Sequence, residues 1–272
     1  MATVQGHHPD FADPPVIETV LGVEFAPIDR WIVPHFGMYW QRIRDDYPKV
    51  QIQPPLAPED PRSKEDRFLQ AAMIEVLAQP PIRCWYINDA GTRLLQVQKD
   101  RFIHNWRKEG RGDEYPRYET IRPLFEREWQ RFCDFLAQER IDTPIPARCE
   151  VTYVNHFIRG REWQEFKDLP RILPVWAGGT REGLLATPEF VAFNTRYPFP
   201  EEKGHLTVHL QPAVRQLDNK EVLQLTLTGR GRPSTPDISD VVSWFDYGRE
   251  RVVQAFCDLT SPEMHRLWGR RE

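Results

Sequence analysis

The sequence predicts an α+β fold in which a mostly antiparallel sheet carries helices on one face. Apolar residues alternate with period two in several segments, as in half-buried strands, and recur with helical spacing in others. Short turns join the strand segments directly, which is typical of antiparallel pairing. The order of elements, β-α-β-β-(β)-α, occurs twice, so we predict an internal pseudo-duplication. We expect a flexible N-terminal arm over residues 1–13, and α+β halves over 14–143 and 144–272 that share one sheet or core.

Cap and breaker residues set the predicted boundaries in the first half. Asp29 and Thr120 can each accept a hydrogen bond from a first-turn amide, so each is expected to cap a helix with an apolar stripe. Pro48 ends the first helix, and four prolines over 53–62 predict a linker. The elements expected here are a strand over 16–25, a helix over 29–47, a further helix over 63–77, a hairpin of strands over 84–87 and 93–106, and a helix over 120–136.

Alternation is clearest in the second half. Leucines and valines over 205–214 and 221–228 alternate on either side of an Asp218-Asn219 turn, which predicts a hairpin. Pro236 and Asp237 start a long helix whose apolar side extends to Phe256. The remaining elements expected are strands over 148–158 and 190–197, a short helix over 161–173 and a last helical turn at 261–263.

The composition excludes several classes of protein. The net charge is −4, so no global positive field draws the chain to nucleic acid or to an anionic membrane. No apolar stretch is long enough to cross a membrane, and residues 1–13 lack the features of a leader, so we expect a cytoplasmic protein with no membrane contact. The four cysteines are far apart and form no CxxC pair, so we expect reduced thiols and no metal site.

Several stretches together resemble a sporadically distributed, uncharacterised family of bacterial proteins of similar length. The stretches are PPVIETVLGVEFAPI, GTRLLQVQKDRFIHNWRK with YPRYE, CEVTYVNHF and HRLWGR. The resemblance implies a role in a phage-defence or CRISPR-neighbouring locus. It implies no reaction, cofactor or site residue.

The segment 99–111 combines basic and aromatic residues, a mixture that single-stranded nucleic acid favours. Its three rings share one face of the predicted strand, so either they bind a partner with the basic residues or they cover the core. A second basic turn follows the last strand, where glycine lets the backbone approach a phosphate. The candidate partner-binding residues are Arg101, Phe102, His104, Trp106, Arg107, Lys108, Arg230 and Arg232.

Two His/Asn pairs form a candidate polar pocket. His104-Asn105 and Asn155-His156 occupy corresponding strands of the two halves, and they would converge if the halves pair about a pseudo-twofold axis. A histidine there would serve as an acid or base near neutral pH, with asparagine orienting it. The alternative is a structural hydrogen-bonded cluster.

Other catalytic patterns have less support. The E-x-K fragments at 165–167 and 201–203 match part of a nuclease site, but neither has a convincing aspartate on a preceding strand. His205 and His209 are too far apart along a strand to share a metal easily.

We therefore expect a non-enzymatic binding or scaffold protein without a cofactor. Its partner would be another protein, RNA or single-stranded DNA, recognised through the open face of the sheet and the basic loops. The alternative is a small-ligand-binding protein or an enzyme with a pocket between the sheet and the long helix. Homo-oligomers formed through a sheet edge are a further alternative.

Overall fold

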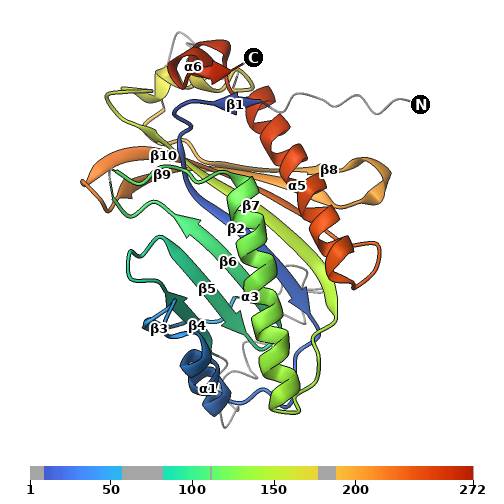
Figure 1. Cartoon of the computed structure of the whole chain (residues 1–272). Helices are drawn as coiled ribbons and strands as arrows, with labels where there is room; N and C mark the ends of the chain where they lie inside the picture. Colours follow the sequence, from blue (N-terminus) through green and yellow to red (C-terminus); the bar gives the residue numbers. More distant parts are fainter. Residues whose placement is uncertain (1–8, 57–81, 111, 177–187, 272) are drawn as a thin grey trace.

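The computed structural model describes residues 9–56, 82–110, 112–176 and 188–271 (Figure 1). In these parts of the chain, nine strands form one antiparallel sheet in the order β3-β4-β5-β6-β2-β7-β10-β9-β8. The two halves meet where β2 pairs with β7, so their strands belong to a single sheet. The bounds are β2 (Val16–Phe25), β3 (Lys49–Gln53), β4 (Arg83–Ile87), β5 (Arg93–Gln98), β6 (Arg101–Arg107), β7 (Pro146–Ile158), β8 (Phe193–Pro198), β9 (His205–Arg215) and β10 (Lys220–Gly231).

Period-two alternation gives the sheet one strongly apolar face. In the β9–β10 pair, Val208 lies opposite Leu227 and Leu210 lies opposite Leu225. All four side chains are fully buried. The predicted hairpin is therefore confirmed, and its register is the one that puts both apolar rows on the same face.

Helices cover the apolar face. Figure 1 shows α3 (Tyr118–Gln138) and α5 (Ile238–Leu259) crossing the same side of the sheet. Phe125 and Phe132 of α3 pack on Phe102 of β6, with ring centroids 5.9 and 5.2 Å away. Burying a side chain of this size contributes roughly 1.5–3 kcal/mol. The other helices and turns are α1 (Val33–Ile43), α4 (Leu169–Ile172), α6 (Pro262–Leu267), η1 (Phe166–Asp168) and η2 (Pro200–Glu202).

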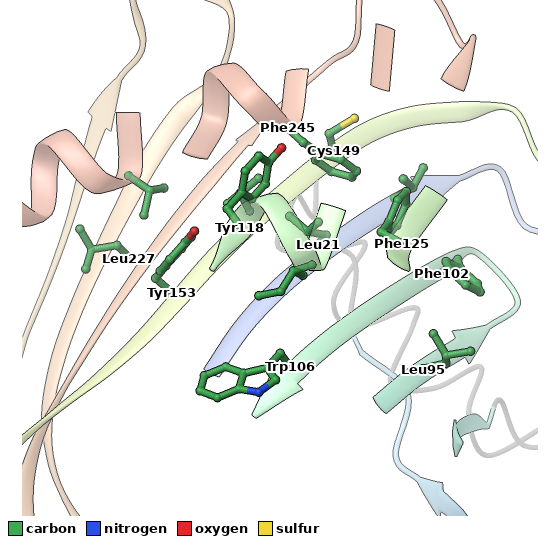
Figure 2. Packing of buried hydrophobic residues seen from close by; sticks show 14 of the residues in the cluster. Leu21, Leu95, Phe102, Trp106, Tyr118, Phe125, Cys149, Tyr153, Leu227 and Phe245 are labelled. Atoms are coloured by element: carbon green, nitrogen blue, oxygen red, sulfur yellow. The ribbon is translucent and has the colours of Figure 1, made fainter. Parts of the chain in front are cut away.

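One hydrophobic core spans both halves, as Figure 2 shows. Leu21 of β2 and Tyr153 of β7 contribute to it from the sheet. Phe125 of α3 meets Phe245 of α5 edge to face at 4.9 Å, which joins the two helices. The α+β class with helices on one face is thus confirmed, whereas the internal duplication stays a prediction.

Two strand segments differ from the prediction because of how the strands pair. The long strand expected over 93–106 is two strands, β5 and β6, because the chain turns between Gln98 and Arg101 and these two residues pair. Strand β3 begins directly after Pro48 and pairs with β4, where the sequence predicted only the end of a helix and a linker.

Helix starts also differ from their predicted positions. Helix α3 begins at Tyr118 with no side-chain cap, so Thr120 lies inside the helix. Helix α1 begins at Val33 after Ile32, so Asp29 does not cap it. The short helix expected over 161–173 is reduced to η1 and α4, and the helix expected over 63–77 lies outside the described residues.

The expected arm over residues 1–13 is wrong for its last part. Strand β1 (Asp10–Phe11) pairs with β11 (Arg270–Arg271) near the other end of the chain. Phe11 is buried and packs edge to face on Phe256 and Trp268, with centroids 5.8 and 6.1 Å apart. Burial of this ring anchors a segment whose polar neighbours had suggested fraying. Within the described residues, no helix is long and apolar enough to cross a membrane.

Candidate functional site

A pocket of about 400 Å³ lies between the sheet and helix α5. From α5, the side chains of Arg249, Val252, Val253 and Phe256 line it. Their spacing of i, i+3, i+4 and i+7 places them on one face of the helix. Tyr153 and Asn155 line the pocket from β7, where alternate residues share a face of the sheet.

Much of the remaining wall comes from three segments far apart in the sequence. The start of α3 contributes Tyr118 and Glu119, and the loop before it contributes Tyr115 and Arg117. The paired chain ends form another wall, with Asp10 and Phe11 from β1 and Arg271 from β11. The β1–β11 pairing therefore completes the pocket.

Two tyrosine hydroxyls converge in the pocket. The hydroxyl oxygens of Tyr115 and Tyr153 are 2.9 Å apart and share a hydrogen bond. Burial raises the pKa of both phenols, well above the usual range for Tyr115, whereas the Tyr115 hydrogen bond and the Arg249 charge partly offset the rise at Tyr153. Both hydroxyls therefore stay protonated at neutral pH and can serve as hydrogen-bond donors or acceptors.

Arginines line the pocket from rim to interior. Arg271 and Arg117 both reach Asp10, at 3.2 and 2.8 Å, and their side chains are 62% and 35% exposed. Arg249 is only 17% exposed, and the nearest oxygen of its ion-pair partner Glu119 is 3.7 Å away. The pocket therefore combines apolar walls with cationic groups at several depths.

The backbone at Arg117 is unusual. Arg117 precedes the first residue of α3 with φ 71° and ψ 156°, a region that non-glycine residues rarely adopt. Its guanidinium donates to the Phe11 carbonyl at 2.9 Å and lies over the Tyr115 ring, 5.5 Å from the centroid. Contacts on the pocket wall thus hold a backbone conformation that costs of order 1–3 kcal/mol. Such outliers cluster at binding sites.

The two His/Asn pairs do not converge. Neighbouring residues of a strand point to opposite faces of the sheet, and His104 and Asn155, which share a face, lie beside Leu21 and Val16 at separate positions along β2. His104 lies fully buried under the helices, and among the described residues neither ring nitrogen has a hydrogen-bond partner. Asn155 faces the pocket and donates to the Leu225 carbonyl at 3.2 Å. Asn105 and His156 lie on the opposite face, where His156 contacts Gln224 at 3.2 Å. The polar constellation expected from the sequence is therefore wrong as a single site.

The rings of the basic and aromatic strand cover the core. Phe102 and Trp106 are 0% and 5% exposed. Arg101 is buried and its guanidinium lies 3.5 Å from a carboxylate oxygen of Glu24. Arg107 pairs with Glu109 at 2.6 Å, whereas Lys108 is half-buried at the end of the strand. Of the two interpretations left open by the sequence, the structure favours the core for the rings.

The opposite face of the sheet carries a polar network. Asn105 donates to Glu18 at 2.6 Å and accepts from Gln96 at 2.8 Å. Burial raises the pKa of Glu18, although the Asn105 hydrogen bond and the Arg107 charge partly offset the rise. Glu18, Arg107, Lys108 and His156 also line a hollow of about 460 Å³ on this face.

Arg230 and Arg232 lie together in a smaller cleft of about 190 Å³. Arg148 and Arg196 line the same cleft, which makes it rich in arginine. Carboxylates compensate part of this charge, since Arg230 pairs with Glu150 at 2.7 Å. Among the described residues, no three His, Cys, Asp or Glu side chains are placed to hold a metal ion.

The residues predicted from the sequence do not include the arginines and tyrosines of the main pocket. The sequence does contain one indication that Arg249 is functional. Arg249 shares a helical face with Val252, Val253 and Phe256, so a charge interrupts an apolar stripe there. No comparable signal marked Arg117 or Asp10, which reach the pocket through a loop and through pairing of the chain ends.

No family model and no curated protein matches the chain, so the family resemblance stays a prediction. Among solved structures, DynU16, a protein in the dynemicin biosynthetic locus, is 11% identical with a TM-score of 0.25. The similarity covers 92% of this chain and 98% of that one. A TM-score of 0.25 does not indicate a shared fold.

Proposed function

We propose that the chain binds a small organic ligand in the pocket between α5 and the sheet. The observation that carries the proposal is the pocket of about 400 Å³, whose apolar walls surround converging tyrosine and arginine side chains. Small-molecule sites commonly enclose roughly 300–1,000 Å³ and combine apolar walls with a few polar groups that orient the ligand.

The polar groups of the pocket are suited to ligand recognition. The Tyr115 and Tyr153 hydroxyls keep their protons at neutral pH, because burial raises the pKa of both, so neither serves as a general base. The side-chain amide of Asn155 donates to a backbone carbonyl of the neighbouring strand. These groups can orient a ligand by hydrogen bonds without exchanging a proton with it.

A bulky substitution in the pocket tests the proposal. We expect N-phenyl-1-naphthylamine, a neutral apolar fluorescent probe, to bind the wild-type protein saturably at one site. Val253→Trp puts a large ring into the half-buried lining and should weaken this binding about tenfold or more. Ser243→Trp places the same ring at an exposed position of the same helix and should leave binding unchanged. Absence of saturable binding, or equal binding by both variants, would overturn the proposal.

Recognition of a protein, RNA or single-stranded DNA, including a defence role, is the second candidate. The arginine-rich cleft around Arg230 and Arg232 favours it. It has less support because Phe102, His104 and Trp106, the rings expected to stack on a partner, are buried.

A further inference from the structure

The ligand pocket carries more arginine than its carboxylates neutralise. Arg117, Arg249 and Arg271 line it together with the carboxylates of Asp10 and Glu119. The Asp10 carboxylate forms ion pairs with two of the arginines, and its oxygens lie 2.8 Å from a guanidinium nitrogen of Arg117 and 3.2 Å from one of Arg271. Glu119 lies 3.7 Å from Arg249, beyond hydrogen-bonding distance, and its side chain is 70% exposed. Arg249 is therefore the least neutralised of the three.

Arg249 is also the arginine most withdrawn from water. Its side chain is 17% exposed, and its Nε is buried with no hydrogen-bond acceptor among the described residues. A guanidinium presents five N–H donors in a planar fork that matches two oxygens of a carboxylate or phosphate. The nearest carboxylate oxygen, from Glu119, is 3.7 Å from this guanidinium, so an anion entering the pocket would gain a charge-assisted hydrogen bond with it.

Neighbouring side chains hold Arg249 in place. The guanidinium carbon lies 5.6 Å from the centroid of the Tyr118 ring, in a cation–π contact. The positive charge of Arg249 lowers the pKa of the Tyr153 phenol, which places the two groups near each other in the pocket. Val252, Val253 and Phe256 continue the same helical face beyond Arg249, so an apolar wall adjoins the cation.

We propose that Arg249 receives the charged end of the ligand, and that the ligand is an organic anion with an apolar body. The carboxylate or phosphate group pairs with the Arg249 guanidinium, and the apolar body lies against Val252, Val253 and Phe256. This inference rests on the ligand-binding function proposed above and assigns its chemical class.

Four linear ligands of ten carbon atoms test the inference by displacement of N-phenyl-1-naphthylamine: decanoate, decyl phosphate, decanol and decylammonium. In the wild-type protein, decanoate, decyl phosphate or both should displace the probe about 10- to 100-fold more tightly than decanol, because a charge-assisted hydrogen bond forms only with the anions. The preference between the two anions distinguishes a carboxylate ligand from a phosphate ligand. Decylammonium should bind more weakly than decanol.

Arginine variants assign the preference to Arg249. Arg249→Met keeps the chain length and should remove the advantage of the anions, whereas binding of the neutral probe shows that the pocket is intact. Arg251→Met is the matched control, because Arg251 lies on the same helix outside this pocket and pairs with Glu250. Should Arg249→Met fail to fold, Arg249→Lys keeps the charge without the planar fork and should reduce the preference about two- to tenfold, whereas an unchanged preference would overturn the inference.

The outcomes separate the two proposals. Equal displacement by anions and decanol in a wild-type protein that binds the probe would overturn the anion inference and leave ligand binding standing. An anion preference that persists in Arg249→Met would also overturn it. Failure of the probe and of all four ligands to bind would overturn ligand binding itself.

Discussion

Acid should destabilise this protein through His104, because folding holds the imidazole in its neutral form. Burial lowers the His104 pKa from 6.5 to about 3, and the charges of Arg93 and Arg127 act in the same direction. Between these two pKa values the unfolded chain binds a proton that the folded chain does not, so stability falls as the pH falls through this window. Linkage gives a loss of about 2 kcal/mol between pH 7 and pH 5, and about 4 kcal/mol by pH 3.

The variant His104→Leu isolates this contribution. It removes the titrating group and breaks no hydrogen bond among the described residues. The free energy of unfolding would be measured by urea denaturation of both proteins at pH 7 and pH 5. We expect wild type to lose about 2 kcal/mol more than the variant, because other groups, such as Glu18, titrate in both proteins and cancel in the difference. Equal losses in the two proteins would refute a neutral, buried His104.

Two further predictions concern the core. Phe102→Ala should reduce the free energy of unfolding by about 3–5 kcal/mol, because it removes a fully buried ring. Lys108→Ala should change this free energy by less than about 1 kcal/mol. If denaturant titrations gave equally small losses for both variants, the buried position of the Phe102 ring would be contradicted. Burial raises the pKa of Cys84 to about 11 and that of Cys149 to about 12, so both thiols are protonated at pH 8. Because the thiolate is the reactive form, both should react with an aromatic disulfide reagent far more slowly in the native protein than in denaturant. The labelling of each thiol would be monitored by mass spectrometry. Fast labelling of either thiol in the native protein would show that this thiol is accessible and not buried.

Local patterns predicted the elements with strong periodicity. The β9–β10 hairpin follows from alternation over 205–214 and 221–228 with a polar turn between them. The stripe up to Phe256 predicted α5, and its apolar side does pack on the sheet. Strand β3 has a weaker local signal and was not predicted. Pairing with β4 stabilises it as a strand, and its own side chains are largely exposed.

The sequence by itself determined the α+β class, the main strands and helices, and which apolar residues lie on the same face of each element. It also determined that Phe102, His104 and Trp106 share one face of a strand. Only the tertiary structure decided that this face is covered by α3 and that the two His/Asn pairs lie apart. It alone formed the pocket, because Asp10, Arg117, Tyr153 and Arg249 come together only when the chain ends pair and α5 lies across β7. Spacing along a chain reports which side chains share an element, whereas contacts between distant elements depend on how those elements pack, which no local pattern encodes.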